Sequence, residues 1–218
     1  MMNTPDKKYW NTTYTELPFH VDHDDWLEKY AAWLDPQKGK IVDLGCGLGH
    51  NAKALHAQGF DVLACDLSEK ALEQLRREEP DMPTLQLDMA DGLPFAEGSL
   101  QAVVADLSLH YFSRSATVRI IGDIHRALRP GGLLLCRVHA VAELAVKHGA
   151  AATQDDPFLY RSEGILRRFF DESELRRFFS DQDWETLERS EQAMERYGRL
   201  KSFWEVGLKE QDRRISDA

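Results

Sequence analysis

The segment from Asp43 to Gly49 carries an acid followed by glycines at alternate positions, in the order Asp-Leu-Gly-Cys-Gly-Leu-Gly. Apolar residues precede it, so the glycines fall where a buried strand must turn. Because glycine has no Cβ atom, backbone N–H groups and the N-terminus of the next helix can lie close to a ligand. The pattern therefore predicts a loop that binds a nucleotide-type cofactor at the carboxyl end of a central parallel strand.

The spacing of the glycines separates two kinds of cofactor. Dinucleotide sites carry G-x-G-x-x-G and place a pyrophosphate at the start of the helix, whereas the third glycine here, Gly49, comes one residue earlier. The carboxylate of Asp43 would repel a pyrophosphate and would attract a ligand with a cationic amino-acid group. The pattern favours such a ligand, with NAD as the alternative.

The Asp43–Gly49 segment resembles the first motif of the class I S-adenosylmethionine-dependent methyltransferases, and the resemblance extends through most of the chain. It implies that S-adenosylmethionine is the cofactor and S-adenosylhomocysteine the product. The turn Pro130-Gly131-Gly132, between a predicted helix and a predicted strand, is a second landmark of this family. The resemblance also implies that the loop binds the cofactor through Asp43, Gly45, Cys46, Gly47 and Gly49.

Two further acids end short apolar runs that are expected to be successive strands. Asp66 lies about 20 residues past the glycine loop, where Rossmann-like folds use a carboxylate to bind ribose. The family resemblance implies that Asp66 binds the ribose and that Leu67 also contacts the cofactor. It further implies that Asp88 accepts a hydrogen bond from the adenine amine while Met89 packs on the ring. The alternatives are structural: Asp66 as an acid at a helix start, and Asp88 as a loop-capping acid beside Met89 in the core.

A later strand end, after the apolar run 100–105, is expected to line the cleft at the reacting end of the cofactor, with Leu107 among the cofactor-binding residues. Methyltransferases that act on amino groups of nucleic-acid bases often carry Asn-Pro-Pro-Tyr or Asp-Pro-Pro-Tyr at this place. The sequence Asp106-Leu107-Ser108-Leu109 departs from that motif. The departure favours a small-molecule acceptor over a base.

Methyl transfer from a sulfonium disperses charge. Most of the rate acceleration therefore comes from aligning the acceptor with the methyl group and from excluding water, and a dedicated base is optional. A hydroxyl or ammonium acceptor would need a proton acceptor, and His110 and His139 both follow predicted strand ends on the catalytic side of the sheet. Tyr14 is a further catalytic candidate. For both histidines, a buried structural role is the alternative. The substrate-pocket candidates are Trp10, Tyr14, His110, Tyr111 and Tyr160.

The elements that must position these residues alternate between apolar runs and amphipathic stretches, which predicts an α/β fold. We expect a doubly wound, seven-stranded, mostly parallel sheet with an N-terminal helical cap and a C-terminal antiparallel hairpin formed by 184–190 and 202–208. The expected organisation of this single methyltransferase domain is a cap over 1–38, a cofactor-binding core over 39–139, a lid-like connection over 140–170, and a helix with the hairpin over 171–218.

Aromatic residues are concentrated in the N-terminal cap, where Tyr9, Trp10 and Tyr14 precede an amphipathic helical stretch over 26–34. They loosely resemble the start of the tellurite-resistance and thiopurine methyltransferase branch, which implies an arm that covers the site. Ordinary packing of this arm on the body is the alternative. Within residues 167–179, paired arginines alternate with paired phenylalanines, and this spacing predicts the solvent and core faces of one helix, with a nucleic-acid-binding surface as the alternative.

Composition limits the partners of the chain. Its 218 residues carry a formal net charge of -10, which disfavours a nucleic-acid backbone as partner. No apolar run approaches the roughly 20 residues that span a bilayer, and with its polar start we expect a cytoplasmic protein without a membrane segment. The three cysteines are expected to be packed thiols. The acids and histidines of 20–25 are expected at a helix start, with no metal bound.

Two other classes of function stay open for this sequence. One is a methyltransferase for a macromolecule, either RNA or protein. The other is a non-catalytic module that binds S-adenosylmethionine for sensing or scaffolding. Binding that weakens steeply with salt would identify a nucleic-acid substrate, and the absence of S-adenosylhomocysteine with any acceptor would identify the module. The sequence specifies no oligomeric state.

Overall fold

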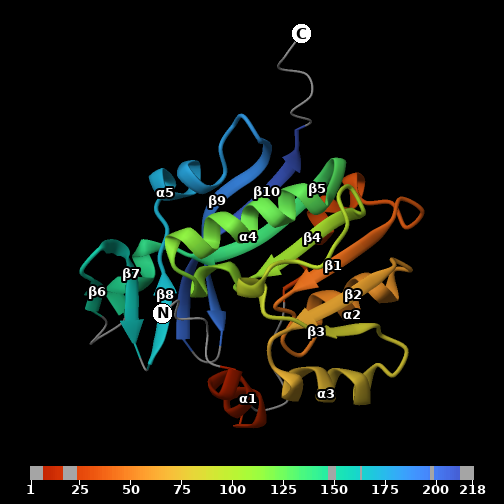
Figure 1. The fold of residues 1–218 in the computed structure, drawn as a ribbon, viewed down its shortest axis with the longest axis horizontal. Coiled ribbons are helices and arrows are strands. Elements are labelled where there is room, and N and C mark those ends of the chain that lie inside the picture. Colours follow the sequence, from red (N-terminus) through yellow and green to blue (C-terminus); the bar gives the residue numbers. More distant parts are fainter. Residues whose placement is uncertain (1–6, 17–23, 147–150, 163, 197–198, 212–218) are drawn as a thin grey trace.

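The computed structural model describes residues 7–16, 24–146, 151–162, 164–196 and 199–211. Its centre is a seven-stranded sheet with the strand order β3-β2-β1-β4-β5-β10-β9 (Figure 1). The strands are β1 Lys40–Leu44, β2 Val62–Asp66, β3 Thr84–Gln86, β4 Leu100–Asp106, β5 Leu128–His139, β9 Trp184–Arg196 and β10 Arg199–Glu210. Strands β1 to β5 pair in parallel, whereas β10 pairs antiparallel with both β5 and β9. This arrangement confirms the predicted doubly wound, mostly parallel sheet with a C-terminal hairpin.

Helices cover both faces of this sheet. The body contains α2 His50–Ala57, α3 Glu69–Glu78, α4 Arg114–Ala127 and α5 Glu172–Phe178, with the short 3-10 turns η1 Glu28–Trp33, η2 Met89–Asp91, η3 Leu109–Tyr111 and η4 Val141–Val146. On one face, α4 and α5 pack against side chains such as Val103 and Leu134. On the other face, α2, α3 and η1 pack against the alternate side chains, such as Val104 and Leu135. The alternation follows from the two-residue period of a strand.

The central strands are apolar on both faces because they lie between these two helical layers. Strand β4 is buried over its first six residues, and only Asp106 at its carboxyl end is partly exposed. The carboxylates of Asp66 and Asp106 stand at the carboxyl ends of β2 and β4, the edge at which an open α/β sheet binds its ligand.

The N-terminal helix α1 Lys7–Glu16 lies beside α3, on the side where β1 and β2 end (Figure 1). The Ser68 hydroxyl donates to Asn11 Oδ1 at 2.8 Å, and Gln74 Nε2 donates to the Tyr14 carbonyl at 2.7 Å. These bonds hold a helical cap in the place that the sequence predicts. The amphipathic stretch 26–34 forms the short 3-10 turn η1 rather than a regular α-helix.

The connection after β5 differs from the expected lid-like loop. It contains η4 and a separate three-stranded antiparallel sheet, formed by β6 Ala151–Thr153, β7 Asp156–Ser162 and β8 Ile165–Arg168. Strand β7 pairs antiparallel with both of its neighbours, Ala152 with Tyr160 on one side and Leu159 with Arg168 on the other, so the backbone of this connection is ordered by strand pairing.

The prediction of one helix over 167–179 is wrong. The first arginine pair belongs to β8, and α5 begins only after Asp171, whose side chain accepts from the Glu174 backbone N–H at 2.8 Å. Phe169 stacks on His139, whereas Phe170 packs into the core beside α5. Because neighbouring side chains point to opposite sides, the backbone at 169–170 is extended, and the helix starts at the capping acid.

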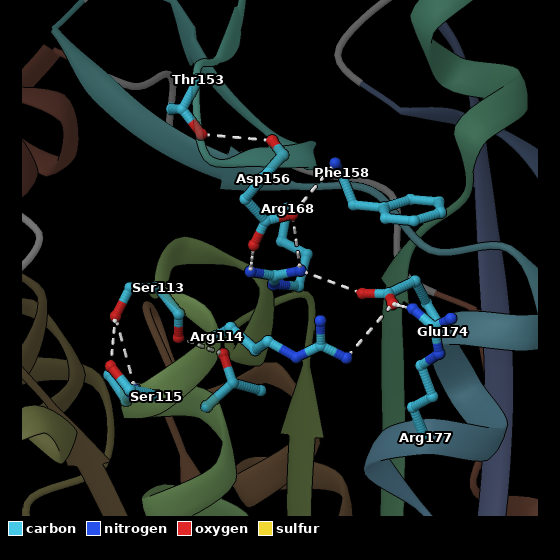
Figure 2. Close-up of polar contacts among 11 residues, drawn as sticks. Ser113, Arg114, Ser115, Thr153, Asp156, Phe158, Arg168, Glu174 and Arg177 are labelled. Atoms are coloured by element: carbon cyan, nitrogen blue, oxygen red, sulfur yellow. Dashed lines mark hydrogen bonds and ion pairs between the residues drawn. The ribbon is translucent and has the colours of Figure 1, made fainter.

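Arg168 connects the small sheet to α5. Its guanidinium is fully buried and pairs with Asp156 of β7 and with Glu174 of α5, the latter at 3.0 Å (Figure 2). Glu174 also accepts from Arg177 at 3.0 Å and lies 3.7 Å from Arg114 of α4. Since the acids compensate the buried charge of Arg168, the network holds β8 in a fixed position against the helices.

Two expectations from composition concern thiols and membranes. Cys65 and Cys136 are buried free thiols and Cys46 is a partly buried one, as predicted. Burial raises the pKa of the Cys65 thiol to about 12, so it stays protonated and packs as an apolar side chain. None of the helices in the described part of the chain is long and apolar enough to cross a membrane.

Candidate active site

A cavity of about 280 Å³ opens at the carboxyl ends of β1, β2 and β4, next to α1. Strand β1 lies between β2 and β4, so the cavity occupies the point where the strand order reverses, the usual ligand site of an open α/β sheet. The predicted cofactor residues in its wall are Gly45, Cys46, Gly47, Asp66, Leu67, Asp88, Met89 and Leu107. The predicted acceptor-side residues in its wall are Trp10, Tyr14, Tyr111 and His139.

The loop after β1 has the left-handed backbone that its glycines permit. The φ angles are 77° at Gly45, 55° at Gly47 and 76° at Gly49, a region that residues with a Cβ atom rarely adopt. A Cβ atom at position 47 would lie 2.6 Å from the Tyr14 hydroxyl oxygen, so the loop lies directly against α1. Gly49 caps the N-terminus of α2 and stands outside the cavity wall.

Asp43 lies buried beneath this loop rather than in the cavity wall. Its Oδ2 accepts from the Ala52 backbone N–H at 3.1 Å, while its Oδ1 is buried and has no hydrogen-bond partner among the described residues. Burial raises the pKa of Asp43 to about 8, and the nearby charges of Asp106 and Asp66 add to the effect. A cationic group in the loop would stabilise the ionised form, so the position fits a positively charged ligand.

Asp66 connects the end of β2 to the glycine loop. Its Oδ2 accepts from the Gly47 N–H at 2.8 Å and its Oδ1 from the Ser68 N–H at 2.7 Å. Burial raises its pKa, although these backbone hydrogen bonds lower it. The side chain thus holds the glycine loop and Ser68, the residue that caps α3, and it also lines the cavity. Each carboxylate oxygen can accept a second hydrogen bond, so the two roles are compatible.

Asp88 and Met89 stand together at the cavity, after β3. Asp88 Oδ1 accepts from the Ala90 N–H at 2.9 Å and caps η2, so the predicted loop-capping role is present. Met89 lies against the glycine loop, because a Cβ atom at position 45 would lie 3.2 Å from its Cε. The acid and the thioether therefore face the same cavity as the loop.

The end of β4 turns sharply into the cavity wall. Leu107 has φ = 53°, and no other non-glycine residue in the described ranges has a positive φ. Its backbone N–H donates to the Arg137 carbonyl at 2.9 Å, and the Ser108 hydroxyl donates to the Leu44 carbonyl at 2.6 Å. These two bonds connect β4 to its neighbours β5 and β1 and hold a backbone conformation that residues with a Cβ atom rarely adopt.

Aromatic rings and a histidine form the other side of the cavity. Trp10 contacts Tyr111 edge to face, with ring centroids 4.9 Å apart, so α1 meets η3 here. His139 stacks on Phe169, with ring centroids 5.6 Å apart. Its place in the wall gives His139 access to a ligand.

Two predicted residues are near this side but outside the wall. His110 is fully buried behind His139, with ring centroids 4.0 Å apart. Tyr160 packs edge to face on Phe169 at 5.4 Å, away from the cavity. Of the two histidines, the structure therefore brings only His139 into the candidate site.

A buried ion-pair network supports the same region, and sequence reasoning missed it. Arg137 of β5 donates to both oxygens of Asp106, at 2.7 and 2.8 Å, and to Asp24 at 2.6 Å. Its guanidinium lies 4.7 Å from the Trp26 ring centroid. Burial lowers the pKa of Arg137, but the bonds to Asp106 and Asp24 outweigh burial and raise it.

Of the predicted helix-start run 20–25, residues 20–23 lie outside the described residues.

Sequence reasoning also missed two cationic residues in the cavity wall, Arg167 of β8 and Lys201 of β10. Arg167 was expected on the solvent face of a helix. The position of Lys201 could have been predicted from the sequence. If the strand predicted over 202–208 begins one residue earlier, position 201 lies on the same face as Phe203.

Comparison with known proteins agrees with this architecture. A family model described as a methyltransferase domain matches residues 41–132, which contain the loop and the strand ends. The protein YqeM of Bacillus subtilis, named as a methyltransferase, is 33% identical over 157 residues, 68% of this chain and 62% of that protein. The tRNA N(3)-methylcytidine methyltransferase Mettl2 of Drosophila melanogaster is 31% identical over 158 residues, 67% of this chain and 48% of that protein. The chain thus spans less than two thirds of either relative.

Among solved structures, a SAM-dependent methyltransferase from Methanosarcina mazei has the same fold. It matches with a TM-score of 0.69 at 17% identity, over 87% of this chain and 99% of that chain. At this identity the likeness concerns the fold, which is that of a Rossmann-like methyltransferase.

Proposed function

Because this chain carries a class I methyltransferase domain, we propose that it is an enzyme that transfers the methyl group of S-adenosylmethionine to a small-molecule acceptor. The observation that carries the proposal is the loop after β1. There, three left-handed glycines lie above a buried acid, at the carboxyl end of the central strand and beside an open cavity. A ligand with an ammonium and a sulfonium group suits this acidic surrounding better than a dinucleotide.

The acids at the strand ends fit the polar groups of this cofactor. Asp43 stabilises its ammonium group, because the buried Oδ1 then gains a compensating charge. Asp66 accepts from the ribose hydroxyls with the lone pairs that its backbone bonds leave available. Asp88 accepts from the adenine amine, while Met89 packs on the ring.

S-adenosylmethionine supplies a methyl group on a sulfonium, which an acceptor displaces in line. The chain contributes chiefly position and exclusion of water. The aromatic rings of α1 cover the loop, and the strained turn at Leu107 fixes the wall beside the reacting end. His139 is the candidate proton acceptor, for an acceptor that loses a proton, because its ring lies in the wall.

A small-molecule acceptor is favoured over RNA. The chain has a formal net charge of -10, and acids line the cofactor side of the cavity. A tRNA substrate is named for the Drosophila relative, which is longer than this chain. RNA methylation is therefore the competing outcome in the test.

The test begins with calorimetric titration of S-adenosylmethionine, S-adenosylhomocysteine and NAD. We expect binding of the two adenosyl ligands alone. The protein is then incubated with labelled cofactor and with panels of small acceptors, proteins and total tRNA, and S-adenosylhomocysteine is quantified. Turnover with a small molecule supports the proposal. Binding of NAD alone, salt-sensitive methylation of tRNA, or cofactor binding without product for every acceptor would each reject it.

A further inference from the structure

The acceptor side of the cavity carries the opposite charge to the cofactor side. Arg167 and Lys201 line the wall there, together with His139. The carboxylates in the wall are Asp66, Asp88 and Asp106, which stand at the ends of β2, β3 and β4. Asp106 is paired with Arg137, so the cofactor side holds the uncompensated negative charge of the strand ends.

The packing of β8 fixes the direction of Arg167. Side chains alternate along a strand, and the next residue, Arg168, points into the buried network with Asp156 and Glu174 (Figure 2). Arg167 therefore points to the opposite face, as does Phe169 two residues later. Phe169 stacks on His139, so Arg167 lies on the face of β8 that is turned toward this histidine, and both residues line the cavity.

The pairing of β10 with β5 fixes the direction of Lys201. Phe203 is paired directly with His139, and paired residues of an antiparallel ladder point to the same face. Lys201 lies two residues before Phe203 and so shares that face. His139, Arg167 of β8 and Lys201 of β10 thus face the same cavity.

We propose that Arg167 and Lys201 form a subsite that binds a carboxylate group of the methyl acceptor and so places the acceptor against His139. The proposal rests on the proposed methyltransferase function and names its substrate class, small organic acids. The planar guanidinium matches the two oxygens of a carboxylate, and the ammonium adds a second charged hydrogen bond. Trp10 and Tyr111 supply an apolar wall beside the cations, which suits the carbon skeleton of a compact acid.

The experiment measures binding and turnover separately. Protein saturated with S-adenosylhomocysteine is titrated with pairs of aromatic and aliphatic acids and their neutral amides, for example benzoate with benzamide, and with phenyl phosphate and tRNA. We expect the acids to bind more tightly than their amides. Arg167→Gln and Lys201→Gln should each weaken binding of the acids about 10-fold or more and leave the affinity for S-adenosylhomocysteine within about twofold.

Matched variants test the position of the charge. Arg176→Gln, on the exposed face of α5, and Lys209→Gln, also on β10 but paired with Glu185 at the surface, should bind the acids like the wild type. Arg167→Lys should retain part of the affinity because it keeps the charge without the planar fork. With an acid that is methylated, the Gln variants should raise KM far more than they lower kcat.

The proposal is overturned if acids and amides bind alike, if both Gln variants bind the acids like the wild type, or if phenyl phosphate or tRNA binds in preference to every acid. Failure of the wild type to bind S-adenosylhomocysteine is a different result, because it removes the proposed function itself. Unchanged S-adenosylhomocysteine affinity in the variants shows that they are folded.

Discussion

Gly47 and Tyr14 lie so close that a Cβ atom at position 47 would stand 2.6 Å from the tyrosine hydroxyl oxygen. One residue belongs to the loop after β1 and the other to the N-terminal helix, so the cap and the cofactor loop form one surface. Gly47 also donates its N–H to Asp66 at 2.8 Å. The position of a single backbone segment is thus set jointly by α1 and by the end of β2.

Gly47→Ala should weaken S-adenosylhomocysteine binding by about 10-fold or more. The methyl group displaces Tyr14, and alanine also disfavours the φ of 55°, by about 1 kcal/mol. Gly59→Ala is the matched control, because φ is 85° there and nothing lies within 4 Å of the added Cβ atom. Calorimetry should therefore show full affinity for the Gly59 variant, which carries a backbone penalty of the same kind without the clash. Equal affinities of the two variants would contradict the close contact.

Asp43 should release a proton when S-adenosylmethionine binds. Burial holds its pKa at about 8 in the free protein, so the carboxyl is largely protonated at pH 7, and the positive cofactor favours ionisation. Calorimetry at pH 7 in two buffers with different ionisation enthalpies measures the number of protons released. We expect a net release that Asp43→Asn abolishes, and an affinity that rises with pH up to about 8. Proton uptake, or release that persists in the variant, would refute the assignment.

The same carboxyl should make the free protein less stable as the pH rises. The pKa is about 8 in the folded protein against an ordinary value of 3.8, so the contribution of Asp43 to stability is complete below pH 3.8 and is lost as the pH rises through 8. Urea unfolding at pH 5, 7 and 9 should show this decline in the wild type. Asp43→Asn should flatten the dependence. A wild-type profile that rises over this range in parallel with the variant would argue against a raised pKa.

Asp66→Ala should weaken S-adenosylmethionine binding by about 1.5 to 3 kcal/mol, because charged hydrogen bonds to ribose and to the Gly47 N–H are lost. Asp61→Ala offers a control just before the same strand, where an exposed acid pairs with Lys40 at 2.7 Å. That change should leave the affinity unaltered. If calorimetry gives the Asp66 variant wild-type affinity, the ribose assignment is wrong.

Arg137→Met should lower the free energy of unfolding by about 3 to 5 kcal/mol, because it leaves Asp106 buried without its partner. Asp24→Asn removes the other partner, whose side chain is 42% exposed, and should cost less than about 1 kcal/mol. Urea denaturation of the two variants compares these values. Similar losses for both would show that the pair with Asp106 is not the dominant one.

The glycine loop and the strand-end acids follow from the sequence because their determinants are local. Glycine is the residue that adopts the left-handed φ of the loop most readily, and Asp43, Asp66 and Asp88 lie at or within two residues of the carboxyl ends of β1, β2 and β3. The C-terminal hairpin was likewise predicted, because its alternating pattern extends over most of two strands. Each of these features depends on a few consecutive residues, so it can be predicted from the amino-acid sequence of a single chain.

The tertiary structure alone decided which side chains face the cavity on the acceptor side. Both histidines follow strand ends, but His139 lies in the wall, stacked on Phe169, whereas His110 belongs to η3 and is fully buried beside His139. Arg167 lies in the wall because Arg168 finds its buried partners on the other side of β8. Such directions depend on contacts between segments far apart in the chain. The two-residue period of a strand shows which side chains share a face. Which part of the fold that face contacts depends on pairing with segments far away in the sequence.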